Sequence, residues 1–162
     1  MISIDAFGDF KSCEVYHLRK NEIKSIDSVF FPNSLGIFYS AMTQFCGFND
    51  FGDEYKLMGL SAYGKFNKKF EKLNEIITFS EKKLYELNLR YFNHHKNKLD
   101  YKWDNSQPKI GQLFNKNALE DLLNISQNKN KNKFINYSDL AFMTQHIYEK
   151  TLFSLLRKYH HI

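Results

Sequence analysis

Two small groups of residues in this sequence have the chemistry and the spacing to bind a polar ligand. The larger group is Asp53, Glu54 and Lys56, which lie in a stretch, Asn33 to Gly64, that holds five of the seven glycines. Glycine lets a backbone approach a ligand closely, and a loop can direct neighbouring charged side chains to one point. This stretch therefore predicts one wall of a binding site, without identifying the ligand.

Asp5 and Asp9 form the second group, on either side of Gly8. A strand that ends in an acid and a glycine turn places a carboxylate at the edge of a sheet. The alternative is turn chemistry, because an Asp side chain often bonds its own backbone two residues further on. The residues by themselves favour this second interpretation.

Histidine and cysteine do not form a recognisable metal or nucleophile motif. The two cysteines, Cys13 and Cys46, make no C-x-x-C pair, and we expect both to be reduced thiols. Neither histidine pair, at 94–95 and 160–161, has the i, i+4 spacing that directs two imidazoles at one metal. We expect both histidine pairs to lie on the surface.

The elements that position the charged groups follow from hydrophobic periodicity. Alternating runs predict three antiparallel strands at 2–4, 11–19 and 22–31. Ser34 then has the side chain of a helix N-cap, and a continuous apolar stripe leads from it to Gly47. This pattern predicts a helix from Ser34 to Gly47.

A second helix should begin at Asp53 and Glu54, whose charges suit the positive end of a helix dipole, and stop at Gly64. Gly59 falls in its interior, where glycine costs roughly 1 kcal/mol relative to alanine. Close packing or a ligand against the backbone should compensate for that cost.

The remaining elements are less regular. The sequence predicts a basic amphipathic helix at 65–77, a half-buried strand at 83–92, a short helix at 118–123 and a helix of more than twenty residues from Ser138. The apolar face of this last helix consists of Leu140, Met143, Ile147, Thr151, Leu155 and Tyr159. We expect that face to be partly uncovered and prone to self-association.

Composition indicates a folded cytoplasmic protein of one-domain size. The 162 residues are 43% hydrophobic and 17% aromatic, which argues against disorder. The net charge of +5 permits nucleic-acid binding, but the only basic cluster, at 128–133, lacks arginine and aromatics and is typical of a solvated loop. We expect neither a nucleic-acid partner nor membrane association, since no apolar run has the length of a signal peptide or a membrane span.

Several motifs, in order along the chain, carry a family resemblance. The segment FFPNSLGIFYSAMTQFCGF and the following DEYKLMGLSAYG resemble the nodulation-type O-carbamoyltransferases and their relatives in antibiotic pathways. SIDAFGD, LNLRYFNHH, QLFNK and SDLAFMTQHIYEKTLFSLLRKYHH resemble further motifs of that family. The sequence departs from the family pattern at Ala6, where glycine is usual.

The resemblance implies a fold of the α/β class, here an α+β fragment with antiparallel strands followed by helices. It implies that residues 1–162 form part of an actin-like ATPase, or ribonuclease-H-like, amino-terminal domain. The upstream His-x-x-x-His segment, the downstream Gly-rich strand and the smaller carboxy-terminal domain would then lie outside this sequence. We therefore expect an internal piece of a carbamoyltransferase, from a split or truncated gene or a partial record.

The same resemblance implies an activity. Family members make carbamoyl-adenylate from carbamoyl phosphate and ATP and transfer the carbamoyl group to a hydroxyl of a sugar or natural product. This chain should be inactive by itself, and its partners would be those two substrates, a hydroxyl acceptor and the remaining pieces of the enzyme. The alternative is a non-catalytic nucleotide-binding remnant or a regulatory domain.

The resemblance also implies site residues, although it identifies no catalytic residue. Asp5 would be one ligand of a divalent metal, expected to be iron. The residues implied along the pocket for ATP or carbamoyl-adenylate are Gly8, Asp9, Glu54, Lys56 and Gly59.

Overall fold

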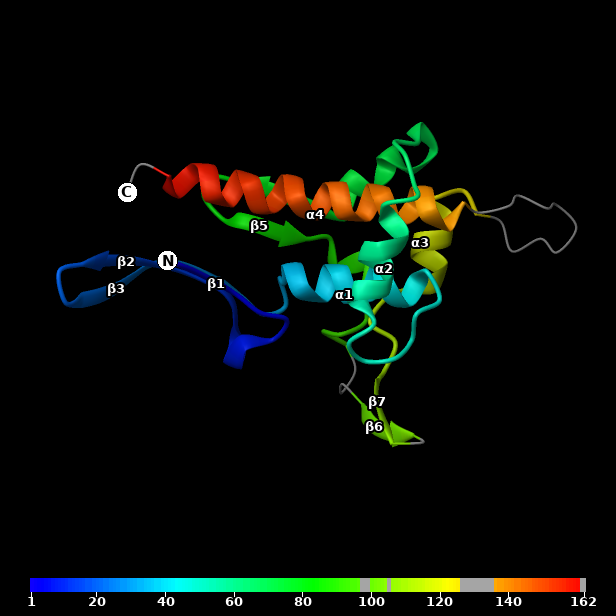
Figure 1. Cartoon of the computed structure of the whole chain (residues 1–162), viewed down its shortest axis with the longest axis horizontal. Coiled ribbons are helices and arrows are strands. Elements are labelled where there is room, and N and C mark those ends of the chain that lie inside the picture. The colour runs from blue at the N-terminus through cyan, green and yellow to red at the C-terminus, as the bar shows by residue number, and fades with distance from the viewer. Residues whose placement is uncertain (97–99, 105, 126–135, 161–162) are drawn as a thin grey trace, which may run out of the picture.

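The chain begins with an antiparallel sheet of three strands, β1 (Ile2–Ile4), β2 (Lys11–Arg19) and β3 (Glu22–Phe30), which lie in that order. The computed structural model describes residues 1–96, 100–104, 106–125 and 136–160. Cys13 and Val15 of β2 and Val29 of β3 are buried, because alternate residues of a strand face the core. The three predicted strands and the turn between the second and third are confirmed, and Figure 1 shows the β2–β3 hairpin extending beyond the helices.

Two short helices follow, α1 (Leu35–Phe45) and α2 (Glu54–Ser61), as predicted. The Ser34 hydroxyl accepts a hydrogen bond from the Ile37 backbone N–H at 3.1 Å, which caps α1. The chain then leaves α1 through Gly47, whose φ of 96° is an unstrained conformation for glycine. The loop that follows brings α2 against α1 (Figure 1).

The longest helix, α4 (Tyr137–Tyr159), packs against α1, α2 and the 3-10 helix η2 (Lys68–Glu75). Its N-cap is Asn136 and not the predicted Ser138, since the Asn136 Oδ1 accepts hydrogen bonds from the N–H groups of Ser138 and Asp139. The apolar positions Leu140, Met143, Ile147, Thr151 and Leu155 are all at most 5% exposed. The expectation of a partly uncovered stripe is therefore wrong for these five positions, because α1, α2, η2 and β4 pack against the helix, whereas Tyr159, the sixth position, is partly buried.

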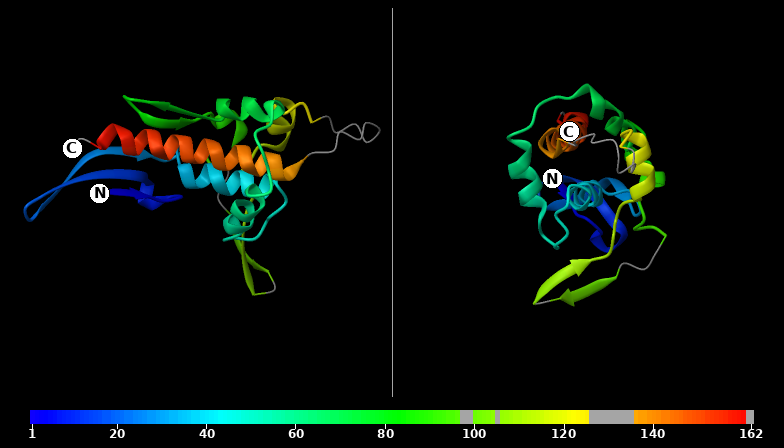
Figure 2. Two further views of the ribbon diagram at one scale, coloured as in Figure 1. Left: turned by 45° about the horizontal axis from the view of Figure 1, so that its top comes forward. Right: turned by 90° about the vertical axis from the view of Figure 1, so that its right-hand side faces the viewer.

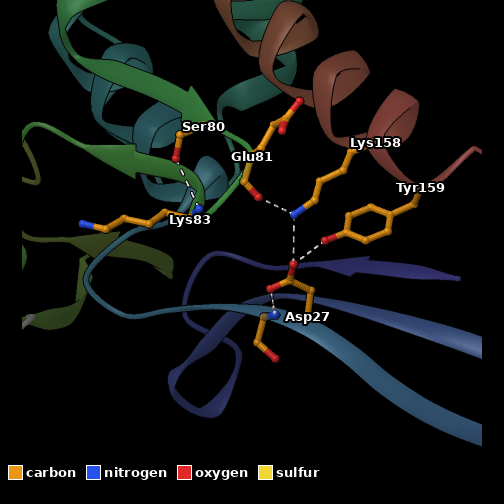
Figure 3. Close-up of polar contacts among 7 residues, drawn as sticks. Asp27, Ser80, Glu81, Lys83, Lys158 and Tyr159 are labelled. Carbon is orange, nitrogen blue, oxygen red and sulfur yellow. Dashed lines mark hydrogen bonds and ion pairs between the residues drawn. The ribbon is translucent and has the colours of Figure 1, made fainter.

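A polar cluster ties the carboxyl end of α4 to the sheet (Figure 3). The Lys158 Nζ donates to the Asp27 Oδ2 at 3.1 Å and to the Glu81 carbonyl at 2.6 Å, and the Tyr159 hydroxyl also donates to Asp27. Three segments that are far apart in the sequence therefore meet at one point. These bonds fix the direction of α4 relative to β3.

The middle of the chain differs most from the sequence prediction. The helix expected at 65–77 is the 3-10 helix η2 followed by the strand β4 (Ile77–Ser80), which pairs with β5 (Leu84–Leu87). The strand expected at 83–92 ends at Leu87, and the 3-10 helix η3 (Leu89–Tyr91) follows. The remaining elements are η1 (Gly8–Phe10), the hairpin of β6 (Tyr101–Asp104) and β7 (Gln107–Ile110), and α3 (Lys116–Leu122). The short helix expected at 118–123 is thus confirmed, whereas the basic tract at 128–133 lies outside the described residues.

The architecture is a mixed α+β arrangement built around α1 and α4. Both helices contribute fully buried side chains to one core, together with residues of the first sheet and the β4–β5 hairpin. Figure 2 shows the β6–β7 hairpin projecting from this body. Over the described part of the chain all strand pairs are antiparallel, so the larger actin-like arrangement stays an expectation. None of the described helices combines the length and the hydropathy that a membrane span requires.

Candidate functional site

A groove of about 430 Å³ lies between α1, α2 and α4, and Ala6, two residues after β1, also lines it. These three helices lie next to one another in Figure 1. The lining consists mainly of aromatic residues and small residues, and three further side chains are polar. It consists of Ala6, Gly36, Tyr39, Ser40, Glu54, Tyr55, Met58, Gln145 and Tyr148. A concave, largely apolar surface with a few convergent polar groups is the usual form of a small-molecule site.

The end of β1 is held directly against the first turn of α1. A Cβ atom at Gly36 would lie 2.9 Å from the Ala6 Cα, so only glycine allows this approach without a shift. The Ser34 hydroxyl donates to the Asp5 carbonyl at 3.1 Å while it also caps α1. The predicted acid at the end of the strand is therefore fixed beside a helix N-terminus.

The Asp5 side chain is exposed, and its Oδ1 accepts a hydrogen bond from the Ala6 N–H at 2.5 Å. A Cβ atom at Gly8 would lie 3.3 Å from the Asp5 Cβ, so the two residues are in contact. Asp9 is also exposed and has a φ of 46° within η1. The structure therefore brings Asp5 and Gly8 together, as expected, and leaves Asp9 in the turn beside them.

Glu54 is the acidic side chain of the groove. The Ser40 hydroxyl donates to its Oε1 at 2.5 Å, and no hydrogen bond to its Oε2 is found among the described residues. Glu54 also borders a separate inner cavity of about 20 Å³, which it shares with Asp50 and Ser40. Such a volume has room for one water molecule, and these polar groups could hold it. The open carboxylate oxygen is thus available to accept a hydrogen bond from a ligand.

Lys56 and Gly59 lie on α2 but do not line the groove. The Lys56 Nζ is 2.6 Å from the Asp53 Oδ1, and this hydrogen bond raises the pKa of the lysine. Gly59 is exposed, and a Cβ atom there would have no neighbour within 4 Å. The expected compensation for its helical cost is therefore not found in the described part of the chain.

Helix α4 supplies two groove residues that the sequence did not identify. The Tyr39 hydroxyl donates to the Gln145 Oε1 at 2.6 Å, and the Tyr39 and Tyr148 rings meet edge to face at 5.1 Å. Burial raises the pKa of Tyr39 to about 12, so its hydroxyl stays protonated and remains a donor. Gln145 and Tyr148 are three positions apart on one helix, but no sequence signal linked them to α1.

His94 is buried, which corrects the expectation that its histidine pair lies on the surface. The side chain is 3% exposed, and its Nε2 lies 2.8 Å from the Pro32 carbonyl. The ring makes edge-to-face contacts with Phe31 and Phe92. Burial lowers the pKa of His94, so a neutral imidazole donates to Pro32 and supports the segment that leads into α1. His95 is partly buried, whereas His160 is exposed as expected.

Neither cysteine lies in surroundings that would activate its thiol. Burial raises the pKa of the Cys13 thiol to about 11 and that of Cys46 to about 12, so both stay protonated near neutral pH. Within the described ranges no group of three or more His, Cys, Asp or Glu side chains is arranged to hold a metal ion. Asp5 is therefore a single potential ligand here and not a metal centre.

Comparison with known proteins gives the family. The family model of the carbamoyltransferase N-terminus matches residues 1–161. The uncharacterized protein sll1178 of Synechocystis sp. is 31% identical over 94 residues, which are 58% of this chain and 15% of that protein. The chain thus spans a small part of the length of this relative. Because the family match extends over nearly every residue, the chain belongs to the carbamoyltransferase N-terminus family.

Proposed function

We propose that this chain is the part of an O-carbamoyltransferase that helps to bind carbamoyl-adenylate and the acceptor hydroxyl. The intact enzyme would make the adenylate from carbamoyl phosphate and ATP and transfer the carbamoyl group to a hydroxyl of a sugar or natural product. The proposal is supported by the family match together with the open Glu54 carboxylate oxygen in a groove that is also lined by Ala6, the residue after Asp5. Since the chain covers only 15% of its relative, it should be inactive alone.

The charge of the groove determines which part of a ligand it suits. Among the residues that the structure describes, Glu54 is the one acidic residue of the lining, and no lysine, arginine or histidine contributes to it. A phosphate among these side chains would meet a carboxylate and no cation, which is unfavourable. A hydroxyl-bearing group, such as a ribose or the acceptor, would instead donate a hydrogen bond to the Glu54 Oε2. The lining therefore suits the hydroxyl-bearing part of the ligand better than its phosphate.

Glu54 has two roles in this proposal. Its Oε1 is held by the Ser40 hydroxyl, which fixes the side chain, and its Oε2 orients a ligand hydroxyl. A carboxylate that accepts from the acceptor hydroxyl also increases the nucleophilicity of that oxygen. Tyr39 and Tyr148 exclude water from one wall of the groove by their edge-to-face contact.

The family resemblance implies a divalent metal, but the described residues do not fit one by themselves. Asp5 offers one exposed carboxylate, and the described segments contain no further group of ligands around it. A metal bound at Asp5 would therefore need ligands from outside these segments. No step of the proposal depends on it.

Lys56, Gly59, Gly8 and Asp9 remain predicted nucleotide contacts. Lys56 would have to exchange its 2.6 Å ion pair with Asp53 for a phosphate. Gly8 leaves the Asp5 carboxylate accessible, and the exposed Asp9 would be an outer polar partner. Their contribution is separable from that of Glu54 by mutation, because none of the four lines the groove.

Titration calorimetry with AMP and with a carbamoyl-adenylate analogue tests the binding step. We expect Glu54→Gln to weaken binding about tenfold, which corresponds to the loss of one hydrogen bond to a charged acceptor. If Lys56 exchanges its ion pair with Asp53 for a phosphate of the ligand, Lys56→Ala should weaken the binding of both phosphate-bearing ligands. Glu86→Gln is the matched control, because Glu86 lies in β5 and pairs with the exposed Lys83. Equal affinity of Glu54→Gln and the wild type would remove Glu54 from the site.

Carbamoyl transfer itself is tested by coexpressing the chain with the part of the uncharacterized Synechocystis relative that it does not match. Labelled carbamoyl phosphate, ATP and a panel of hydroxyl compounds are the substrates. Transfer that requires this chain and is reduced by Glu54→Gln supports the enzyme. Nucleotide binding without transfer under any of these conditions would favour the alternative of a non-catalytic remnant.

A further inference from the structure

Gln145 is the polar residue that α4 contributes to the groove, apart from the tyrosine beside it. In the described part of the chain, α1 contributes Ser40, α2 contributes Glu54 and α4 contributes Gln145. Ser40 and Glu54 bond to each other, as described above, whereas Gln145 has two other partners. The polar chemistry of the α4 wall therefore depends on how the Gln145 amide is held.

Two partners determine the orientation of the Gln145 amide. Glu149 lies one turn further along α4, and its carboxylate only accepts hydrogen bonds, so the atom 2.6 Å from its Oε1 must be the Gln145 Nε2. The amide oxygen then faces Tyr39, whose hydroxyl donates to it at 2.6 Å. A reversed amide would place its oxygen against the Glu149 carboxylate, which is unfavourable. The amide is thus fixed in one orientation.

One N–H of the Gln145 amide is left for a ligand. An amide nitrogen carries two hydrogens, and within the described part of the chain the bond to Glu149 is the one hydrogen bond that this nitrogen donates. Gln145 is half-buried and lines the groove, so the second hydrogen is available there. The groove therefore offers a donor on α4 and the acceptor Oε2 of Glu54 on α2.

A carbonyl oxygen suits the Gln145 donor better than a phosphate does. The amide carries no charge, and among the described residues the one charged group of the lining is the Glu54 carboxylate, which repels an anion. The hydroxyls of Tyr55 and Tyr148 also belong to the lining, but they can rotate. The Gln145 N–H is instead directed by the two bonds of its amide, and a fixed donor is the better discriminator of a carbonyl.

The proposed function indicates which carbonyl this is. It places the acceptor hydroxyl at the Glu54 Oε2, and transfer requires that hydroxyl to come within about 3–3.5 Å of the carbamoyl carbon. The carbonyl oxygen is bonded to the same carbon, so it must lie in the same groove as Glu54. A donor on the α4 wall of this groove can then reach it.

We infer that Gln145 is a specificity-determining residue whose free Nε2–H donates a hydrogen bond to the carbonyl oxygen of the carbamoyl group. The inference rests on the proposed function, because it takes carbamoyl-adenylate as the ligand of the groove. Tyr39 and Glu149 are positioning residues, since each acts on the carbonyl through the amide. Ligands with the carbamoyl group gain affinity from Gln145, and ligands without it do not.

Titration calorimetry of the full chain with two ligands separates this bond from the binding of the nucleotide. The first ligand is N-carbamoylsulfamoyl adenosine, a stable analogue of carbamoyl-adenylate, and the second is AMP, which has no carbonyl. Gln145→Met keeps the approximate length of the side chain and removes the donor. We expect this variant to weaken binding of the analogue about tenfold and to leave that of AMP unchanged. Unchanged AMP binding also shows that the variant is folded.

Two further variants complete the test. Tyr39→Phe keeps the ring but releases the Gln145 amide oxygen, so it should weaken binding of the analogue by a smaller factor and leave AMP binding unchanged. A purely structural role of Tyr39 would instead affect both ligands equally. Gln107→Met makes the glutamine substitution at an exposed residue of β7 outside the groove, and it should change neither affinity.

The failure of this inference differs from the failure of the proposed function. If Gln145→Met binds the analogue as tightly as the wild type, or loses affinity for AMP and the analogue by the same factor, the inference is overturned and the proposed function stands. A wild-type chain that binds neither ligand contradicts the proposed function, and the inference is overturned with it.

Discussion

Replacing Gly59 by alanine should increase the stability of the folded monomer. Gly59 lies inside α2 with no positive φ, so alanine can adopt its conformation without strain. No described atom lies within 4 Å of the position that the new methyl group would occupy. The gain is then the difference in helix propensity, about 0.8–1.0 kcal/mol. For a chain of this length that corresponds to an increase in Tm of about 2–4 °C.

Gly64→Ala is the matched comparison, because it is also a Gly→Ala change and lies three residues after the end of α2. There the Cβ atom would lie 2.0 Å from the Ser138 carbonyl oxygen and 2.8 Å from the Phe142 Cβ, and backbone cannot move as a flexible side chain can. We expect a loss of about 1–3 kcal/mol from overpacking, with α2 and the start of α4 pushed apart. The two variants should therefore shift stability in opposite directions.

Urea unfolding followed by circular dichroism measures both effects. The protein must be dilute enough to be monomeric, so that any effect of Gly59→Ala on association does not enter the free energy of unfolding. A Gly59→Ala variant that is less stable than the wild type under these conditions would refute the reasoning. Another part of the same chain would then have to lie against Gly59. A stabilised Gly64→Ala variant would show that α2 does not approach α4 as closely as described.

Three further predictions concern the supports of the site. Burial lowers the pKa of His94, so the unfolded chain binds a proton more readily than the folded chain, and the urea midpoint should fall as the pH drops below about 6.5. His94→Phe should flatten that pH profile. Ser34→Ala should destabilise the chain by about 0.5–2 kcal/mol in urea unfolding, since it removes the cap of α1 and the bond to the Asp5 carbonyl. Asp139→Ala should cost about 1–3 kcal/mol in the same assay, because the Lys65 N–H and the Asn67 amide lose their acceptor.

Local patterns predicted the first sixty residues well because their structure is determined by neighbours in the sequence. The Ser34 cap, the apolar stripe of α1 and the glycine after it form one continuous signal. The strands before it alternate, and their short turn leaves few other pairings. The general family resemblance was also confirmed, because several motifs occur in the same order.

The middle of the chain could not be predicted in this way. Residues 65–77 have helical spacing, but the segment folds as η2 and then enters β4, since Ile77 pairs with Leu87. That pairing is a tertiary contact, and helical periodicity alone does not reveal it. The burial of His94 likewise depends on Pro32, which is 62 residues away in the sequence.

The residues of the candidate site also fall into those with a local sequence signal and those that depend on tertiary contacts. Asp5, Gly8 and Glu54 stay predicted site residues. The charged cluster at a helix start pointed to Glu54, whereas the family resemblance implied roles for Asp5 and Gly8. Gln145 and Tyr148 belong to a regular helix, and the sequence predicted the helix without indicating which of its residues reach α1. Gly59 shows the opposite limit. The sequence predicted close packing or a ligand against it, but in the described part of the chain no atom lies within 4 Å of the position of its Cβ. A residue whose sequence pattern predicts burial and whose structure shows exposure therefore indicates a missing contact, and Gly59 is the position where that contact should be sought first.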